Sequence, residues 1–436
     1  MTFLSSFVRL NWLSTDGKLI LLARTIRTFA YGFLSIVLAV YLKLSGFDDT
    51  LIGLILTSTL INGVIFTLLA TIYADRIGRK KILIVYAGLM SVSGLIFFVS
   101  NTYILLIISA LVGTINVTGS ETGSFLSLEQ AILPQTIKDL KKRNIGYGIY
   151  NMIGTFAMSA GVLLSGLPTV IQYYYHLSNV QSIKPLFLIY AILGFIVLII
   201  YLNLSNKIEV GVLNDKDNKK KKQNKITTTN KTKSTAKKTL SPKSKEIITK
   251  LSGLFAIDSF AGGFVIQSIV SLWFFTRFEI DLTILSYIFS IAGVLTAFSF
   301  IISTKIADRF GLINTMVFTH LPSNILLILV AFSPSFLLAI IFYLVRMGLS
   351  QMDVPTRQSY IVAVVNEDER TVAAGFTNIS RNVAQAISPS IAGYILQSAS
   401  FLAAPFLFGG LLKIVYDILI YANFKKIKPP EEQQKE

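Results

Sequence analysis

Long, almost uninterrupted runs of apolar residues constrain this chain more than any other feature. Residues 187–202 read FLIYAILGFIVLIIYL, and residues 402–412 read LAAPFLFGGLL. Soluble domains carry about 25% charged residues, whereas only 14% of these 436 residues are charged. A lipid bilayer needs about 20 consecutive apolar residues for each helix that spans it. The chain is therefore predicted to be an all-α integral membrane protein.

The apolar runs divide into twelve predicted spans, with a polar stretch in the middle. Six spans precede residues 205–250 and six follow, so we predict one six-helix bundle over 1–204 and a second over 251–436, which includes a short tail. The expected fold has twelve transmembrane helices in two pseudo-symmetric six-helix bundles. The predicted spans are 19–42, 51–71, 82–100, 103–126, 147–167, 185–204, 251–274, 283–304, 313–333, 335–360, 373–396 and 402–423.

Lysine and arginine are concentrated on one side of this predicted topology. The loops on the side of the N-terminus hold most of them, whereas the opposite loops carry only Lys43, Lys184 and Arg277. Because cytoplasmic loops are enriched in Lys and Arg, both termini and the central polar stretch are expected in the cytoplasm. The expected location is the cell membrane, which the chain crosses many times.

The central polar stretch, residues 205–250, contributes much of the formal net charge of +17, since it holds fourteen lysines and four acidic residues. Residues 211–245 have almost no large apolar side chains, so this cytoplasmic linker is expected to be disordered. Two interpretations remain open: a patch for anionic lipid head groups, or a solvated tether that enforces topology. Because the excess charge lies in this one linker, nucleic acid is not an expected partner.

The two halves repeat short patterns in the same order. Residues 71–78 read TIYADRIG, and residues 304–311 read TKIADRFG, 233 positions later. In the same way, FAYGF at 29–33 corresponds to FAGGF at 260–264. Nearly constant offsets indicate an internal duplication. Parallel repeats related by an axis along the membrane normal are a known transporter plan, in which the solute binds at the repeat interface.

The sequence ADRIGRKK at 74–81 resembles the loop motif of the major facilitator superfamily, and the weaker copy ADRFG follows the eighth predicted span. The resemblance covers most of the chain outside the linker and tails, and it implies a secondary transporter. The family usually has a glycine where Thr71 stands. The residues that match the motif in its two copies are Asp75, Arg76, Gly78, Arg79, Lys80, Asp308, Arg309 and Gly311.

The resemblance also implies a role for these motif residues. In the family, the acid and base that correspond to Asp75 and Arg79 form a latch between the halves that stabilises one access state. A carboxylate such as Asp75 is favoured at a helix N-terminus by the helix dipole. For the basic residues, a purely topological role is equally compatible with the sequence.

Ionisable residues within the predicted spans are costly unless they face a partner or a cavity. Arg27 and Asp258 occupy equivalent positions in the two repeats, and so do Glu129 and Arg357. Each of these pairs has opposite charges, so each is predicted to form a salt bridge between the halves. The sequence leaves open whether these bridges are static or break and re-form during transport.

The tenth predicted span carries more charge than a buried helix tolerates without a reason. Arg346 lies near its middle, and Asp353 follows seven residues later on the same helix face. In one interpretation Arg346 holds an anionic solute group and Asp353 carries a coupling proton. In the other, Arg346, Asp353 and Arg357 form an intrahelical network that only neutralises itself.

Several further charged residues have simpler or parallel interpretations. Glu121 lies among small residues in GSETGSF and is a candidate proton carrier, because such residues leave room for water. Lys413 and Asp417 are four residues apart and are predicted to form a local ion pair. His320 is interpreted as a hydrogen-bonded interior residue. The candidate solute and coupling residues are Arg27, Glu121, Glu129, Asp258, Arg346, Asp353, Arg357 and Arg381.

The expected function is secondary transport of a small polar or anionic solute by alternating access, with proton coupling through these carboxylates. A multidrug or metabolite exporter, an uncoupled facilitator and a non-transporting sensor are the alternatives. The chain has no P-loop, HExxH or G-x-S-x-G motif, so no enzyme activity is expected. With no cysteine and two histidines, no metal site and no cofactor are expected either. We expect a monomer.

Overall fold

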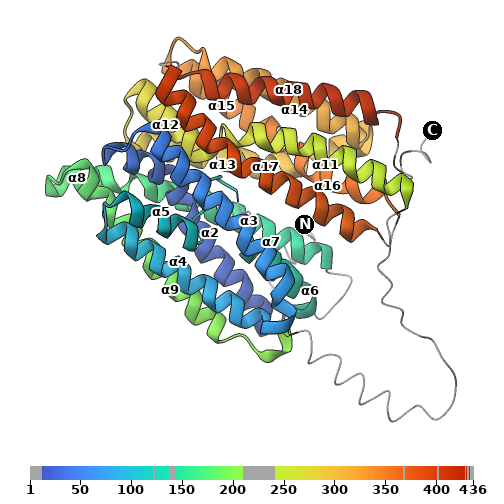
Figure 1. The fold of residues 1–436 in the computed structure, drawn as a ribbon, viewed down its shortest axis with the longest axis horizontal. Helices are drawn as coiled ribbons and strands as arrows, with labels where there is room; N and C mark the ends of the chain where they lie inside the picture. The colour runs from blue at the N-terminus through green and yellow to red at the C-terminus, as the bar shows by residue number, and fades with distance from the viewer. Residues whose placement is uncertain are drawn as a thin grey trace.

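The computed structural model describes residues 12–120, 123–137, 143–209, 241–366, 369–399, 402–427, 429 and 432. Its helices form two bundles that lie side by side (Figure 1). The first bundle comprises α2 (Thr15–Leu44), α3 (Asp49–Ile77), α4 (Arg79–Val99), α5 (Tyr103–Val112), α6 (Ser124–Thr136), α7 (Arg143–Leu163), α8 (Leu167–Tyr175) and α9 (Asn179–Leu202). The second comprises α11 (Pro242–Gly263), α12 (Gln267–Phe278), α13 (Leu282–Phe310), α14 (Leu312–Ala331), α15 (Phe336–Ser350), α16 (Asp353–Ala363), α17 (Arg370–Ala399) and α18 (Ala404–Phe424).

Short polar caps start many of these apolar helices, because the first N–H groups of a helix have no partner within it. Asp48 accepts a hydrogen bond from the backbone N–H of Leu51 at 2.8 Å. In the same way, Asp281 accepts one from Ile284 at 2.9 Å. These caps therefore fix the residue at which each of these helices begins.

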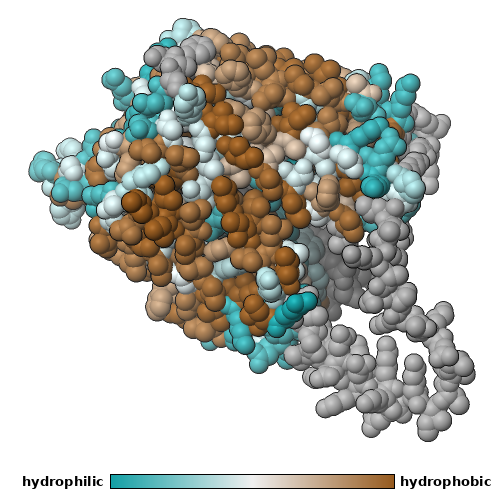
Figure 2. Space-filling view, viewed as in Figure 1, coloured by the Kyte–Doolittle hydropathy of each residue, from teal (hydrophilic) through white to brown (hydrophobic). Residues whose placement is uncertain are grey.

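Ten helical segments of the described chain are long and apolar enough to cross a membrane. On the face drawn in Figure 2, apolar side chains cover most of the middle of the molecule, and polar ones gather mainly towards its ends. Two of the twelve predicted spans are not among these ten segments. The span predicted at 103–126 is broken, and the span predicted at 373–396 lies in α17, a 30-residue helix that carries several polar side chains. The twelve-span, two-bundle architecture is consistent with these helices.

Three of the predicted spans contain irregular backbone, which corrects the expectation of continuous helices. The span predicted at 103–126 ends as helix at Val112 and resumes at Ser124, and Gly119 between them has a φ of +75°. The second bundle has breaks at 264–266, between α11 and α12, and at 351–352, between α15 and α16. Irregular backbone at membrane depth is tolerated only inside the protein or along a polar cavity. The breaks therefore identify the interior region where a site is expected.

The two copies of the loop motif end in the same backbone geometry. Gly78 and Gly311 have φ values of +109° and +86°, which favour glycine, and a helix starts directly after each. Glu209 accepts hydrogen bonds from the N–H groups of Arg79 (2.7 Å) and Lys80 (3.1 Å), at the start of α4. Glutamates thus cap these helices. A role for Asp75 at a helix N-terminus stays a prediction, because its side chain lies outside the described set.

The second bundle repeats this cap. Glu432, in the C-terminal tail, accepts a hydrogen bond from the N–H of Leu312 at the start of α14 (2.7 Å). A glutamate near the end of each six-helix half therefore binds the start of the helix that follows the motif loop of the same half. This correspondence extends the internal duplication beyond the sequence matches.

The second bundle begins earlier than predicted. Ser241 accepts a hydrogen bond from the N–H of Ser244, and Pro242 occupies the first turn, so α11 starts nine residues before the expected boundary at 251. Residues 205–209, also assigned to the linker, end in a short 3₁₀ turn over Asn206–Ile208. The expectation of disorder for the rest of the linker concerns residues that lie outside those described.

The start of α11 is attached to the loop before α17 through Glu369. Its carboxylate accepts hydrogen bonds from the N–H of Ser241 (2.6 Å) and from Nδ2 of Asn366 (2.8 Å). The hydroxyl of Ser244 and the backbone N–H of Ser241 hold the pKa of Glu369 below its usual range. This contact connects the linker to the second bundle.

Replacing Glu369 by glutamine is expected to destabilise the protein at neutral pH but not in acid. Because the folded pKa lies below the unfolded value of about 4.3, the carboxylate contributes stability above that pH and loses it as the pH falls through the folded pKa. The midpoint of thermal unfolding in detergent, measured from neutral pH downwards for both proteins, should converge in acid. A difference that grows as the pH falls would contradict this assignment.

Candidate functional site between the two bundles

At one end of the molecule the two bundles are in tight contact. We call it the far end, and we call the opposite end, where α9 finishes and α11 begins, the linker end. In α3 and α17, a Cβ atom added to Gly53 would lie 2.5 Å from the carbonyl oxygen of Pro389, and Gly393 faces Gly53 in return. The hydroxyl of Thr57 accepts a hydrogen bond from the N–H of Ser390 (2.9 Å), and the two hydroxyls are 2.7 Å apart.

Two other helix pairs extend this far-end contact. The hydroxyl of Ser268 in α12 donates to the carbonyl oxygen of Ser35 in α2 (2.7 Å). The hydroxyl of Ser290 in α13 donates to the carbonyl oxygen of Ser159 in α7 (3.0 Å). The N–H of Ser268 also donates to the carbonyl oxygen of Val117, so the breaks in the fourth and seventh spans meet (3.2 Å). At the far end, helices of the two bundles therefore contact each other's backbone, and these contacts close that end.

Towards the linker end the same helices separate. A Cβ atom added to Gly63 in α3, Gly148 in α7 or Gly375 in α17 would meet nothing within 4 Å. Hydrogen bonds that join the two bundles are found at mid-depth and nearer the far end. The structure is accordingly open at the linker end and closed at the far end.

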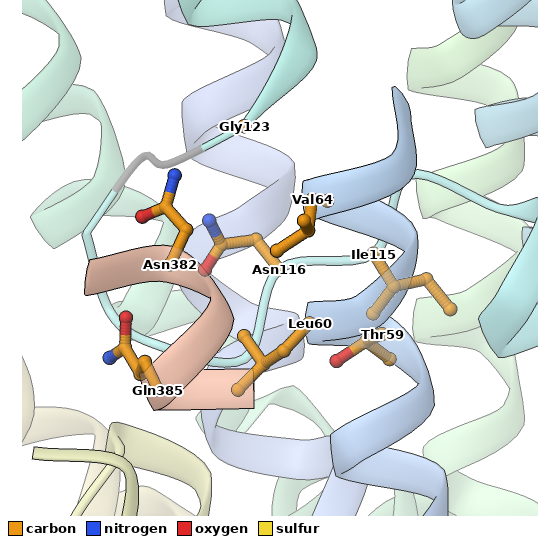
Figure 3. Close-up of a pocket in the computed structure, with 9 residues that line it drawn as sticks. Thr59, Leu60, Val64, Ile115, Asn116, Gly123, Asn382 and Gln385 are labelled. Carbon is orange, nitrogen blue, oxygen red and sulfur yellow. The ribbon is translucent and has the colours of Figure 1, made fainter. Parts of the chain in front are cut away.

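A small cavity of about 40 Å³ remains where the bundles begin to separate. Asn382 and Gln385 from α17 lie on one side of it, and Thr59 from α3 and Asn116 from the irregular segment lie on the other (Figure 3). This volume holds only a few water molecules. The polar lining suits hydrogen-bonding ligands, but a solute needs the bundles to move before it is enclosed here.

In the first bundle, Arg27 forms a closed, completely buried cluster with Glu129. The two guanidinium nitrogens lie 3.0 and 2.8 Å from the two carboxylate oxygens. The hydroxyls of Tyr150 and Tyr201 donate to the same carboxylate at 2.6 Å each. The predicted bridge between Arg27 and Asp258 is wrong, because Arg27 finds its partner within its own bundle.

In the second bundle, Asp258 and Arg357 form the equivalent pair with the charges exchanged. Nη1 of Arg357 lies 3.1 Å from Oδ2 of Asp258 and 2.8 Å from Oδ2 of Asp353. Nζ of Lys413 lies 2.5 Å from Oδ1 of Asp258. The predicted pairing of Glu129 with Arg357 is therefore wrong as well. A bundle that moves as one body keeps its buried charges paired throughout the cycle.

The second-bundle cluster continues through His320 and Asp417, which sequence reasoning did not place in the site. Nδ1 of His320 lies 2.7 Å from Oδ1 of Asp417, and Nδ2 of Asn324 donates to Oδ2 of Asp417 (2.8 Å). Nε2 of His320 is 3.8 Å from Oδ1 of Asp258. The predicted Lys413–Asp417 pair is wrong, because the two side chains bind different partners. The i,i+4 spacing within one helix favoured a local ion pair. In the structure, Lys413 instead contacts Asp258 of α11, and Asp417 contacts His320 of α14.

Arg346 and Arg381 differ from these cations, because neither forms a salt bridge with a carboxylate of the described residues, although Asp258 and Asp353 are near enough to Arg381 to attract it electrostatically. Arg346 is 9% exposed, its Nε has no hydrogen-bond partner, and Nη1 contacts only the sulfur of Met347 (3.3 Å). Arg381 is half-buried and donates from Nε to the hydroxyl of Ser259 (3.0 Å). The hydroxyl of Ser350, one turn after Arg346, is also buried without a partner. Buried donors of this kind require an explanation such as a bound ligand.

The predicted network within the tenth span is only partly present. Asp353 pairs with Arg357 in α16, as one interpretation expected. The helix break at 351–352 separates Arg346 from both, so Arg346 and Asp353 do not share one continuous helix face. Glu121, the other proposed proton carrier, lies outside the described residues.

The remaining motif residues lie at the linker end. Arg76, Asp308 and Arg309 are exposed, and the guanidinium of Arg309 lies 5.3 Å from the ring centroid of Phe310. Nη1 of Arg79 donates to the carbonyl oxygen of Ala131 (3.3 Å), and Nζ of Lys80 to that of Leu204 (2.6 Å). These contacts attach the first motif loop to its own bundle. The latch between the halves remains a prediction for another access state.

The chain is similar in sequence to known membrane proteins. The profile of the Major Facilitator Superfamily matches residues 20–389 and 324–436. An uncharacterized membrane protein of Saccharomyces cerevisiae, YJR124C, is 27% identical over 431 residues, which cover 96% of each chain.

Two solved structures show the likeness in fold. The nucleoside transporter NupG matches with a TM-score of 0.68 and 15% identity, over 94% of this chain and 99% of that one. The inward-open conformation of the xylose transporter XylE from E. coli matches with a TM-score of 0.66 and 15% identity, over 95% and 98%.

Proposed function

The chain belongs to the major facilitator superfamily, and from that premise we propose that it carries a small polar or anionic solute across the cell membrane by alternating access. The observation that carries the anionic choice is Arg346, a buried guanidinium without a carboxylate partner among the described residues. A buried charge without a partner is expensive, so it persists where a ligand supplies the counter-charge.

The contrast with the other buried cations supports this assignment. Arg27, Arg357 and Lys413 each bind a carboxylate of their own bundle. They are therefore committed to structure or coupling, and Arg27 loses its proposed role as a solute ligand. Arg346 and Arg381 remain as the pair that holds the anionic group, with the amides of Asn382 and Gln385 available for its polar parts.

The open linker end supports an inward-facing state. If the Lys-rich linker lies in the cytoplasm, as the charge bias of the loops indicates, the described conformation opens to the cytoplasm. The likeness to an inward-open structure of the xylose transporter agrees with this orientation. The opposite state requires the far-end contacts of α3 with α17 and of α2 with α12 to separate. The motif loops around Asp75 and Asp308 then approach each other and latch.

A neutral, polyhydroxylated solute is the second candidate. It is favoured by the amide and hydroxyl lining of the cavity, where Thr59, Asn116, Asn382 and Gln385 offer donors and acceptors without charge. An uncoupled facilitator and an exporter of apolar compounds remain outcomes of the same transport assay. Proton coupling is proposed to involve the buried charge cluster of the second bundle, which contains Asp258 and Asp353.

A disulfide across the far end is expected to stop transport reversibly. The hydroxyls of Thr57 and Ser390 are 2.7 Å apart, so cysteines at both positions fall within disulfide reach. The chain has no other cysteine. In proteoliposomes supplied with pools of labelled carboxylates, phosphate or sugars, the oxidised Thr57→Cys/Ser390→Cys protein should lose flux and regain it on reduction.

The single variant Thr57→Cys, treated with the same oxidant, is the matched control and should keep its flux. Binding of the transported solute from the linker side should survive in the cross-linked protein, because that side stays open. Unchanged flux through the cross-linked protein would contradict alternating access across this contact. Absence of flux for every pool in folded, reduced protein would favour the sensor interpretation.

A further inference from the structure

The second bundle contains a buried histidine–aspartate pair that the transport mechanism above does not use. His320 in α14 and Asp417 in α18 are 3% and 0% exposed. Asn324 donates to Oδ2 of Asp417, and Nδ1 of His320 contacts Oδ1. Both carboxylate oxygens are therefore occupied, and the imidazole is held in one orientation. The opposite ring nitrogen, Nε2, points towards Asp258.

The gap between Nε2 of His320 and Oδ1 of Asp258 is 3.8 Å, which exceeds a hydrogen bond of about 2.7–3.2 Å. Nδ2 of Asn324 also lies 3.1 Å from Nδ1, so this nitrogen has two polar neighbours. In the tautomer whose Nδ1–H donates to the Asp417 carboxylate, a neutral ring presents its Nε2 lone pair to a second carboxylate. A proton bound at Nε2 turns this contact from repulsive to attractive. One proton thus decides whether His320 and Asp258 approach or stay apart.

Asp258 already has a competing partner on the same oxygen. Nζ of Lys413 lies 2.5 Å from Oδ1, while Nη1 of Arg357 lies 3.1 Å from Oδ2. A protonated His320 would share Oδ1 with Lys413 and weaken that ion pair. The proton therefore adds one positive charge to the cluster, next to Asp258, and weakens the existing ion pair between Asp258 and Lys413.

The position of Asp258 connects this exchange to the gate. It lies on α11, just before the break at 264–266, and α12 beyond the break donates to α2 from Ser268 and Ser271. A shift of Asp258 towards α14 moves the helix whose continuation closes the far end. The matching cluster of the first bundle, Arg27 with Glu129, has no histidine and is completely buried.

From this geometry we infer that His320, held by Asp417, is the proton-binding group of the transporter and controls the far-end gate through Asp258. The inference rests on the proposed function, because it assigns the proton to a step of the transport cycle. The proton adds to Nε2 on loading and leaves from it on release, and no other bond is made or broken.

The surroundings of His320 define what else titrates with it. Helix α18 brings Lys413, Tyr416 and Asp417, and α11 brings Asp258. Asp353 and Arg357 of α16 reach the pair only through Asp258, and so does Arg381 of α17, which is near enough to Asp258 to interact with it electrostatically. In the described part of the chain, no ionisable side chain of α13 or α15 is found in contact with His320. The response to pH should therefore depend on His320 and Asp417.

The full chain offers a direct test, because His176 and His320 are its two histidines. His176 is exposed at the end of α8 in a left-handed conformation, with a φ of +51°, which asparagine tolerates. His176→Asn therefore leaves one isotope-labelled imidazole signal. Its NMR chemical shift should change as the pH is varied, because Nε2 gains or loses a proton. A chemical shift that does not change with pH would overturn the inference.

Coupling to the gate is measured separately. Leu69→Cys in α3 and Val372→Cys in α17 place two spin labels on exposed positions of helices that diverge towards the linker end. If two conformations differ tenfold in proton affinity, their population ratio changes about tenfold across the titration. The distance distribution in nanodiscs should therefore respond to pH, and His320→Gln and Asp417→Asn should remove the response.

His176→Asn is the matched control and should retain the response. A pH response that persists in both His320→Gln and Asp417→Asn would refute the role of the pair. Solute flux with no pH response in wild-type distances or rates would also refute it, yet would leave the transport proposal intact. The distances could respond to pH in the wild type but not in His320→Gln or Asp417→Asn, while no solute shows flux. That result would support the role of the His320–Asp417 pair and contradict the transport proposal.

Discussion

Replacing Arg346 by methionine is expected to weaken binding and carriage of an anionic solute strongly and, at the same time, to raise the stability of the folded protein. The two effects have one cause. Arg346 is buried without a carboxylate partner among the described residues, so the folded protein bears its desolvation cost until a ligand arrives. Methionine fills a similar volume without that cost.

The expected magnitudes follow from buried charges in general. A hydrogen bond to a charged group contributes about 1.5–3 kcal/mol, and each 1.4 kcal/mol is about tenfold in affinity, so solute binding should weaken by about ten- to a hundredfold or more. Exchanging buried ionic groups for apolar ones is often stabilising by about 1–4 kcal/mol. We therefore expect a higher thermal midpoint for Arg346→Met.

Binding by isothermal titration and unfolding in the same detergent would measure both effects. Arg346→Lys keeps the charge and should retain part of the binding. Arg277→Met, at an exposed position of α12, is the matched control and should change neither quantity. A destabilised Arg346→Met protein would show that the guanidinium has a structural partner, and it would remove the main support for the anionic solute.

Replacing Arg27 by methionine should have the opposite effect, a large loss of stability. Here the guanidinium binds Glu129 through two contacts of 3.0 and 2.8 Å, and both side chains are completely buried. Removing one partner of a buried pair leaves an uncompensated charge, which costs about 3–5 kcal/mol. Equilibrium unfolding by denaturing detergent would measure this loss.

A double variant separates the charge effect from the loss of packing. Arg27→Met with Glu129→Gln removes both charges but keeps an amide oxygen for the hydroxyls of Tyr150 and Tyr201. It should recover more than half of the lost stability, and it should retain transport if the cluster has only a structural role. A double variant as unstable as Arg27→Met alone would mean that packing, not the unpaired carboxylate, explains the loss.

Taken together, the two bundles use their equivalent charged positions differently. The first bundle surrounds one ion pair with two tyrosines and excludes water. The second spreads the corresponding pair into a chain from Asp417 through His320 and Asp258 to Arg357, all buried. The duplication thus left one half with a closed ion pair and the other with a chain of four ionisable residues.

The partners of the predicted site residues show how far sequence reasoning reaches. Repeat equivalence correctly grouped Arg27 with Asp258 and Glu129 with Arg357, but equivalence is not contact. Residues related by the pseudo-symmetry lie in different bundles, whereas a buried charge needs a partner that moves with it. His320 and Lys413 gave no sequence signal for the cluster, since their partners on α18 and α11 are 97 and 155 residues away.

The sequence by itself determined the membrane location, the two-bundle plan and the family, because apolar run length, loop charge and the ADRIGRKK motif are local properties. It also identified Arg346 as a charge that a spanning helix does not carry without a reason. Only the tertiary structure decided where the helices break, which charges pair, and which end is open. These depend on which helices pack together, and a buried charge or an irregular backbone segment takes its partners from whichever helices are adjacent in space.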